Sequence, residues 1–453
     1  MRPMHAPSAA IRVDEPRAGI ARGLWQGRRR YIALLLFSNL FINYIDRINL
    51  SIAAPTVAAE FGWDAATMGV LFSSYQWTYM VCLLVWGHLC DRVGTRAVNA
   101  ASVSIWSLAA MLTGAATGFG SMLTSRLILG VGEAASFPAA GKVVRQWFPP
   151  RERGLATAIF NAGTFAGPAL AAPAIAWLLI AIGWRASFVA CGALGFVWVA
   201  VWWWTFQSPE QCRWLSDEER AFLTAQPQGR PAAPSVSTGG ILPRLLAQKT
   251  MWGLFLTQGC CAYTMLLFLF WLPSYLVQSR QMTITQASWF TAIPYLVAAV
   301  LGMVIGQFSD RLLAGQDVAG GQRRSLLVGF ILLSMSVLAT NAVTNHYALL
   351  VLVSFSLTCI SSALSLNIAL TSDLVWDSRA VGTALAFTLM GGNLFGAVMP
   401  LVTGRLVAST GSYDAAFRVA ASLLLVAAGS CLALARRPVL LTSAAAVHGT
   451  RHD

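Results

Sequence analysis

The chain has 453 residues, of which 57% are hydrophobic and only 11% are charged, and its formal net charge is +13. A soluble domain carries about 25% charged residues, so this composition argues against a soluble enzyme, a disordered chain and a nucleic-acid factor of this length. Long apolar runs with almost no charge are typical of a membrane protein with several spans. Orientation in the bilayer explains the excess of basic residues, so we expect a lipid bilayer and no nucleic acid as partner.

We predict an all-α membrane protein with twelve transmembrane helices, because the chain contains twelve apolar runs of about 20 residues or more. The N-terminal 30 residues are polar and Arg-rich and lack the pattern of a secretory signal. In chain order, the predicted spans are 31–55, 68–90, 97–117, 121–143, 154–180, 185–206, 250–277, 286–308, 323–344, 347–372, 379–406 and 413–435.

One long polar stretch divides these spans into two sets of six. It carries several prolines, and Ser216 with Glu219 predicts a short capped helix near 216–225. The predicted parts are a cytoplasmic tail at 1–30, a six-helix bundle at 31–206, a cytoplasmic linker at 207–249, a second six-helix bundle at 250–435 and a cytoplasmic tail at 436–453.

Basic residues gather on one side of the predicted membrane. Seven arginines lie in the N-terminal tail, and further basic residues follow the second and fourth spans, such as Arg92, Arg96 and Arg151. The opposite connections hold few basic residues, all close to span ends. By the positive-inside rule both termini are cytoplasmic, which requires an even number of spans.

The two halves repeat a short pattern at equal spacing. Gly87, Asp91 and Arg92 follow the second span, and a matching set follows the eighth, namely Gly306, Asp310 and Arg311. Repeated halves indicate a transporter built from parallel repeats, with a site between them near the bilayer midplane. We predict that Gly87, Asp91, Arg92, Asp310 and Arg311 form a gating latch at the cytoplasmic rim. The alternative is ordinary helix ends with positive-inside charge.

The segment from Gly87 to Arg96 resembles the loop signature of the major facilitator superfamily, which packs two six-helix bundles around a central cavity. Further patterns resemble its anion:cation symporter branch, which includes bacterial hexuronate and D-galactonate transporters and the vesicular glutamate and sialic acid carriers. These patterns are Asn43–Arg47 in the first span, Arg126 to Glu133 with Pro138 in the fourth, and Gln146–Pro149 followed by Glu152, Arg153 and Gly154.

Four charged residues lie inside the spans, all in the first half: Asp46, Arg47, Arg126 and Glu133. Each costs about 2.5–3.5 kcal/mol at a helix centre, so they must face a cavity and pair. Arg126 and Glu133 are seven residues apart on one helical face, which suits a pair that forms when Glu133 is ionised and opens when it is protonated. The alternative is a structural ion-pair network between spans one and four.

The resemblance implies roles for individual residues. Arg47 is the ligand of the substrate carboxylate, and Asp46 is a proton carrier. Tyr44 and Tyr79 contact the substrate, while Thr164 stands where the family has a substrate-binding Gln. From the residues themselves we expect Glu133 to be the second proton-coupling group and Arg126 to bind the substrate when Glu133 is protonated. Asn393 lies beside glycines in the eleventh span and extends the site into the second half, and packing is the alternative for the tyrosines.

These observations predict a proton-coupled symporter that imports a small organic anion, a sugar acid such as a hexuronate, aldonate or aldarate, across the bacterial inner membrane. Rival functions are import of another carboxylate such as an aromatic acid, a proton-coupled drug exporter, a non-transporting sensor on the same fold, and an intramembrane enzyme. The spans contain no catalytic set and no phosphate-binding loop, so we expect no enzyme activity, no metal and no cofactor beyond the proton gradient. We expect the carrier to work as a monomer.

Overall fold

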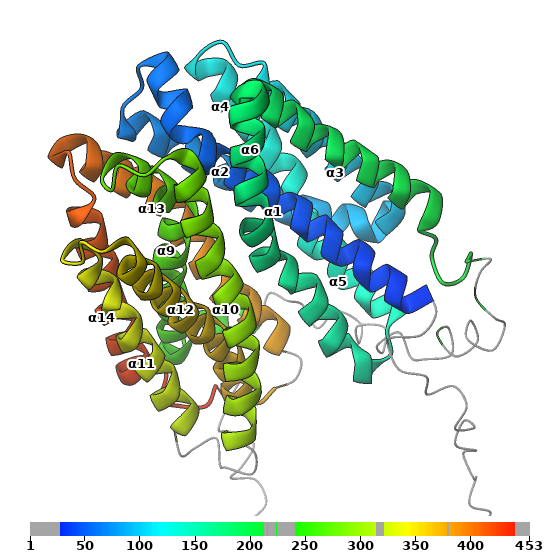
Figure 1. Cartoon of the computed structure of the whole chain (residues 1–453). Coiled ribbons are helices and arrows are strands. Elements are labelled where there is room, and N and C mark those ends of the chain that lie inside the picture. The colour runs from blue at the N-terminus through cyan, green and yellow to red at the C-terminus, as the bar shows by residue number, and fades with distance from the viewer. Residues whose placement is uncertain are drawn as a thin grey trace, which may run out of the picture.

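The computed structural model shows a bundle of long helices (Figure 1). It describes residues 28–212, 215, 223, 241–313, 321–377 and 380–439, and the side chains at 307, 310–313 and 341 also lie outside the description. The predicted tails therefore lie almost entirely outside the described residues, as do most of the linker and its short helix at 216–225. Every named element in the described part is a helix, which confirms the all-α fold.

The first half of the chain forms six elements. Helices α1 to α3 follow one another with very short connections, and α4 and α5 together make one span with a break between them. Helix α6 is the longest. The elements are α1 (Arg28–Phe61), α2 (Ala65–Val93), α3 (Thr95–Gly114), α4 (Phe119–Glu133), α5 (Ser136–Trp147) and α6 (Pro150–Thr205).

The second half begins with a short helix and continues with long ones. A 3-10 helix, η2, directly follows α11, so the last turns of that span are tighter than those of an α-helix. The elements are α8 (Ile241–Leu246), α9 (Lys249–Gln278), α10 (Ile284–Leu313), α11 (Gln322–Ser334), η2 (Met335–Asn341), α12 (His346–Leu374), α13 (Val381–Thr410) and α14 (Asp414–Leu434).

Eleven helical segments of the described chain are long and apolar enough to cross a membrane. One of them, α6, has 56 residues and is interrupted at Gly183, whose φ of 80° and ψ of 164° are not helical. A positive φ of this kind favours glycine, so the sequence itself allows the chain to turn there. The break separates two pieces that correspond to the predicted spans 154–180 and 185–206, so the structure agrees with twelve crossings.

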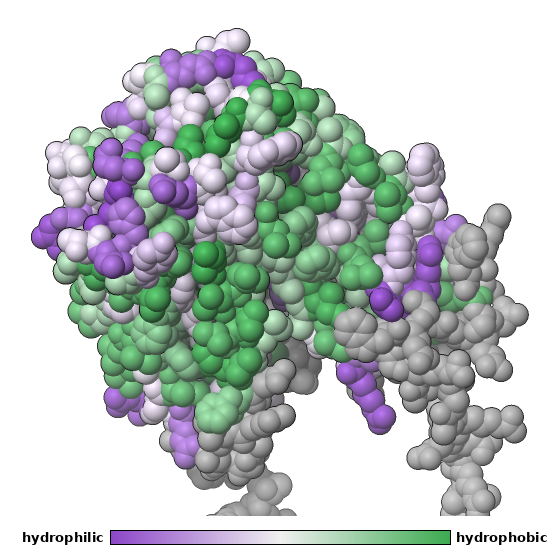
Figure 2. Space-filling view, in the orientation of Figure 1, coloured by the Kyte–Doolittle hydropathy of each residue, from purple (hydrophilic) through white to green (hydrophobic). Residues whose placement is uncertain are grey.

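The helices form two groups that lie side by side (Figure 1). Helices α1 to α6 make one group and α9 to α14 the other. Figure 2 shows hydrophobic residues over the flanks of both groups and hydrophilic residues gathered toward the helix ends. This distribution fits helices whose flanks face lipid. The chain is a multi-pass membrane protein, as predicted.

The two groups touch along α2 and α13, which run antiparallel to each other. A Cβ atom on Gly69 would lie 2.4 Å from the carbonyl oxygen of Pro400, and one on Gly404 would lie 2.5 Å from that of Ala65. Only glycine allows the backbones to come this close. Further along, the hydroxyl of Ser73 donates to the carbonyl of Ala397.

A second contact joins α1 to α9 on the same side. The hydroxyl of Ser51 reaches the carbonyls of Leu269 and Phe270 at 2.8 Å. The ring of Phe72 packs on those of Phe270 and Trp271, with centroids 5.5 and 5.2 Å apart. These contacts lie at the end of the molecule that holds the start of α2, and α6 packs against α10 as a further part of the boundary. At the other end of α2 a Cβ on Gly87 would meet nothing within 4 Å.

Candidate functional site

The site starts on α1, where polar side chains interrupt an apolar helix. Asn43, Asp46 and Arg47 are all buried, with exposed fractions of 0%, 1% and 8%. Asp46 and Arg47 are neighbours, so their side chains leave the helix about 100° apart. Asp46 interacts electrostatically with Cys191 of α6 and with Arg126 of α4, which places it inside the first half. Arg47 instead lies beside the tyrosines described below.

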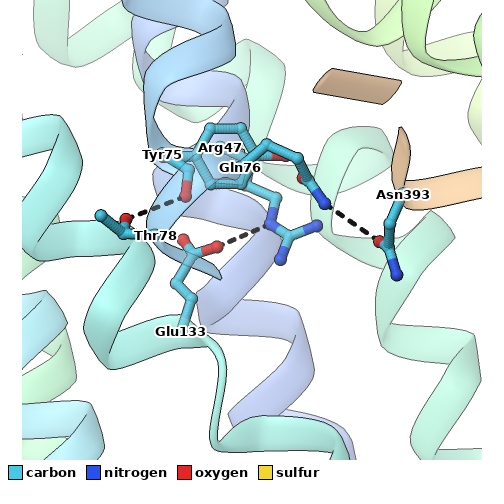
Figure 3. Close-up of polar contacts among 6 residues, drawn as sticks. All are labelled: Arg47, Tyr75, Gln76, Thr78, Glu133 and Asn393. Carbon is cyan, nitrogen blue, oxygen red and sulfur yellow. Dashed lines mark hydrogen bonds and ion pairs between the residues drawn. The ribbon is translucent and has the colours of Figure 1, made fainter. Parts of the chain in front are cut away.

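The break between α4 and α5 places the carboxylate that faces Arg47. Glu133 is the last residue of α4, and the helix restarts at Ser136. Pro138 follows closely and has no backbone N–H to continue the hydrogen-bond ladder, so the sequence favours a break at this point. The Nε atom of Arg47 donates to Oε2 of Glu133 at 2.8 Å, and the Glu133 side chain is fully buried (Figure 3). This ion pair links the first and fourth predicted spans.

Three tyrosines surround the guanidinium of Arg47. Its central carbon lies 4.9 Å from the ring centroid of Tyr44, 5.2 Å from that of Tyr75 and 5.4 Å from that of Tyr79. Tyr75 and Tyr79 are one helical turn apart on α2 and therefore share a face. Aromatic faces attract a cation, so the tyrosines hold the guanidinium in place when its carboxylate partner changes.

A glycine of α6 sets the position of Tyr44. A Cβ on Gly167 would lie 2.5 Å from the Cβ of Tyr44. Any larger residue at 167 would push α1 away from α6. The Gly-rich segment of the fifth predicted span therefore serves the packing of α1, and through it the site.

Arg126 and Asp46 lack the partners that their burial calls for. The Nε and Nη2 atoms of Arg126 and both carboxylate oxygens of Asp46 are buried without a hydrogen-bond partner, as is Oε1 of Glu133. Arg126 is 3% exposed and interacts electrostatically with Glu133 and Asp46. Buried polar groups are normally hydrogen-bonded, so unpaired ones next to an ion pair point to a place that a ligand or a proton fills.

The structure pairs Glu133 with Arg47 rather than with Arg126. The expectation from the sequence was a switchable pair of Arg126 and Glu133 on the same helix. Arg126 lies two turns away along α4, about 10 Å in rise, whereas Arg47 approaches from a facing helix. Arg126 is therefore the cation left without a hydrogen-bonded carboxylate.

Asn393 extends the site into the second half. Its Oδ1 atom accepts a hydrogen bond of 3.0 Å from Nε2 of Gln76 on α2 (Figure 3). Thr164 is half-buried on α6, and its hydroxyl donates to the carbonyl of Asn161 in its own helix at 2.7 Å. The structure therefore brings Asn393 into contact with the first half and shows Thr164 bonded only within α6.

The predicted gating residues lie at the far end of α2. Asp91 accepts a bond of 3.1 Å from Nζ of Lys142 on α5, and that carboxylate is 75% exposed. Arg92 is exposed as well. Asp310 and Arg311 belong to α10, but their side chains lie outside the described residues. The latch across the two halves thus stays a prediction, and the described ion pair of Asp91 lies within the first half.

Two residues of the site were not singled out from the sequence. Gln76 is an isolated amide in an apolar helix, a pattern that looks like a satisfied core residue. Tyr295 of α10 is 1% exposed, its hydroxyl has no hydrogen-bond partner, and it interacts electrostatically with Tyr44. Its signal in the sequence was a polar aromatic one residue after Pro294 in an otherwise apolar span.

Charged groups buried between the spans of a two-part helical membrane protein are typical of solute transporters, and the family and relatives given next identify the chain as a transporter and not an enzyme. The sequence matches the Major Facilitator Superfamily over residues 36–316 and 254–450, and the chain belongs to that family. This confirms the resemblance that the Gly87–Arg96 segment carries.

Curated relatives cover almost the whole chain. A protein of Escherichia coli (strain K12) named as a probable galactarate/D-glucarate transporter is 32% identical over 421 residues, covering 89% of this chain and 92% of the relative. A D-galactonate transporter of Escherichia coli O6:H1 is 29% identical, covering 88% and 94%. A probable galactarate/D-glucarate transporter of Bacillus subtilis (strain 168) is 31% identical, covering 86% and 88%.

Solved structures share the fold. A bacterial homologue of the human lysosomal transporter Spinster aligns with a TM-score of 0.72 at 19% identity, covering 90% of this chain and 97% of that one. The nucleoside transporter NupG aligns with a TM-score of 0.66 at 15% identity, covering 89% and 99%.

Proposed function

We propose that this transporter is a proton-coupled symporter that imports a sugar acid across the bacterial inner membrane. The observation that carries the proposal is the buried arrangement of two arginines and two carboxyl groups, in which Arg47 is paired with Glu133 and Arg126 has unpaired nitrogens. The names of the curated relatives, which are transporters of galactonate and of galactarate or glucarate, support the substrate class.

The two arginines favour an anionic substrate. A guanidinium binds a carboxylate through two parallel hydrogen bonds, and an ammonium group cannot do the same. The unpaired Nε and Nη2 of Arg126 offer that geometry. Arg47 offers it when its hydrogen bond to Glu133 is broken. A cationic drug would meet both arginines, so the drug-exporter alternative is disfavoured by charge.

Charge balance supports proton coupling. When a carboxylate enters beside the Arg47–Glu133 pair, it adds a negative charge to a site from which water is largely excluded, and burying uncompensated charge is costly. A proton taken up by Glu133 removes one negative charge and frees Arg47 for the substrate. Asp46, with both oxygens unpaired, is the second place for a proton.

The arrangement of the two halves fits alternating access. The halves touch near Gly69 and Gly404 and through Ser51, and α6 packs against α10. The basic residues predict that the end with Gly69 and Gly404 faces the periplasm, so in this proposal these contacts close the periplasmic side while the cytoplasmic side opens. The substrate would leave to the cytoplasm when Glu133 loses its proton and forms its ion pair with Arg47 again. In this proposal the carrier acts as a monomer and uses the proton gradient alone, without a cofactor.

Uptake into proteoliposomes tests the function. The purified carrier should accumulate radiolabelled D-galactonate, galactarate or a hexuronate when the lumen is alkaline, and a protonophore should abolish accumulation. An aromatic carboxylate and a lipophilic cation serve as comparison substrates. Accumulation of the aromatic acid alone would show that the carrier imports aromatic carboxylates instead of sugar acids. Absence of uptake for every acid in a well-folded sample would contradict the proposal.

A further inference from the structure

Gln76 and Asn393 form a neutral pair at the boundary between the halves. Nε2 of Gln76 donates to Oδ1 of Asn393 at 3.0 Å, and Gln76 is 5% exposed. The other hydrogen bonds described here between the halves, from Ser51 and Ser73, end on backbone carbonyls. The amide pair is therefore a side-chain link between the halves that a ligand can replace with its own hydrogen-bonding groups.

This pair lies next to the arginine site. Gln76 directly follows Tyr75 and precedes Tyr79 by three residues, and both rings lie within 5.4 Å of the Arg47 guanidinium. In the view of Figure 3, that guanidinium lies between Glu133 and the amide pair. A substrate whose carboxylate binds the arginines therefore extends its other end toward Gln76 and Asn393.

The chemistry at that far end is uncharged. The Lys, Arg, Asp and Glu residues inside the spans belong to the first half, while the second-half helices carry these residues and His only near their ends. Each amide offers donors and one acceptor, which match a hydroxyl that both donates and accepts. A carboxylate only accepts, so the amides could donate to it, but no cation would balance its charge.

We infer that Gln76 is a specificity-determining residue that, with Asn393, binds the hydroxylated end of the substrate, and that the carrier takes polyhydroxy acids with one carboxylate in preference to dicarboxylates. This inference rests on the proposed function, because it assigns the two ends of a sugar acid to the two sides of that site. Hydroxyl groups of the substrate replace the Gln76–Asn393 bond and keep the halves linked through the ligand.

Two six-carbon acids that differ only at the far carbon provide the test. D-galactonate ends in a CH₂OH group and galactarate ends in a second carboxylate. In binding and counterflow measurements with the purified wild-type carrier, D-galactonate should bind at least about tenfold more tightly than galactarate. Equal affinity, or preference for galactarate, would overturn the inference while leaving sugar-acid transport intact. Binding of neither acid would overturn both this inference and the proposed function.

Variants at position 76 make the test specific. Gln76→Arg supplies a cation at the far end and can still donate to Asn393, so it should raise galactarate affinity relative to D-galactonate by about tenfold. Gln278→Arg introduces the same charge at the end of α9, where the Gln278 side chain accepts from the Tyr413 hydroxyl, and should leave the ratio unchanged. An unchanged ratio in folded Gln76→Arg would contradict the assignment of Gln76.

A truncation separates ligand binding from packing. Gln76→Ala should weaken D-galactonate binding by about three- to tenfold, the effect of one neutral hydrogen bond. Glycerate, a three-carbon acid that keeps the carboxylate and lacks the far carbons of D-galactonate, should bind the variant and the wild type equally. Equal losses for both acids would mean that Gln76 only holds the two halves together.

Discussion

Glu133 forms a buried ion pair with Arg47 of α1, although Arg126 lies on its own helix two turns earlier. The pair joins α1 and α4, two helices of the first half. In the proposed mechanism, protonation of Glu133 releases Arg47, whereas Arg126 already has unpaired nitrogens in the described state.

The first prediction concerns Arg47. Arg47→Ala should abolish substrate binding in calorimetry and should also lower thermal stability, because it leaves Glu133 buried without its partner, a loss of about 3–5 kcal/mol for a buried pair. The double variant Arg47→Ala, Glu133→Gln should regain stability without regaining binding. Arg185→Ala, which removes an exposed pair with Glu60, is the matched control and should bind normally. Near-normal affinity of Arg47→Ala would show that Arg47 is not the carboxylate ligand.

The second prediction concerns Glu133 as the proton carrier. Glu133→Gln mimics the protonated side chain and cannot exchange a proton, so it should bind the anion and exchange it in counterflow. Its binding should depend less on pH than that of the wild type, and uptake driven by a proton gradient should fail. Both assays are run side by side in proteoliposomes. Normal concentrative uptake by the folded variant would leave Asp46 as the sole candidate.

The third prediction concerns the rim at the end of α2. Asp91→Asn removes the negative charge that pairs with Lys142 and should slow turnover several-fold while leaving substrate affinity within about twofold, since the pair is remote from the site. Stability should change little, because exposed ion pairs contribute about 0–1 kcal/mol. Lys142→Met should slow turnover to a similar extent, and Lys142→Arg, which keeps the positive charge, should turn over like the wild type. A large loss of affinity at normal turnover would contradict the gating role.

The fourth prediction concerns the seal between α2 and α13. Gly69→Ala places a methyl group 2.4 Å from the Pro400 carbonyl, so the helices must separate there. Spin labels near Asp64 and Ser409 in a cysteine-free background should report longer distances by pulsed electron resonance. Gly120→Ala, where a Cβ meets nothing within 4 Å, is the control. An unchanged distance distribution would show that the close approach does not set the closed state.

Sequence patterns predicted the spans because lipid imposes a length and a polarity on each helix. They also identified Asp46, Arg47, Arg126 and Glu133, since charge inside a span is rare and demands an explanation. They did not predict that Glu133 pairs with Arg47, because the choice depends on how α1 is rotated and how far it lies from α4. That information is spread over packing contacts such as the one between Gly167 and Tyr44.

Gln76 was missed for a related reason. One amide in an apolar helix carries little information until its partner is known, and Asn393 lies more than 300 residues away along the chain. The twelve predicted spans, in contrast, needed only local sequence. Local sequence did not predict how two of these spans are connected: the spans on either side of Gly183 are joined by that single non-helical residue within one long helix.

The seal at the Gly69–Gly404 end is built from backbone carbonyls, hydroxyls and aromatic rings, whereas the described contact at the opposite rim is a solvent-exposed ion pair. Dissolved ions screen exposed charges over about 8–10 Å at physiological ionic strength and leave uncharged, tightly packed contacts almost untouched. The two faces of the carrier therefore respond unequally to their surroundings. We expect salt to weaken the Asp91–Lys142 pair within the first half and to leave the packed contacts between the halves near Gly69 and Gly404 almost unchanged.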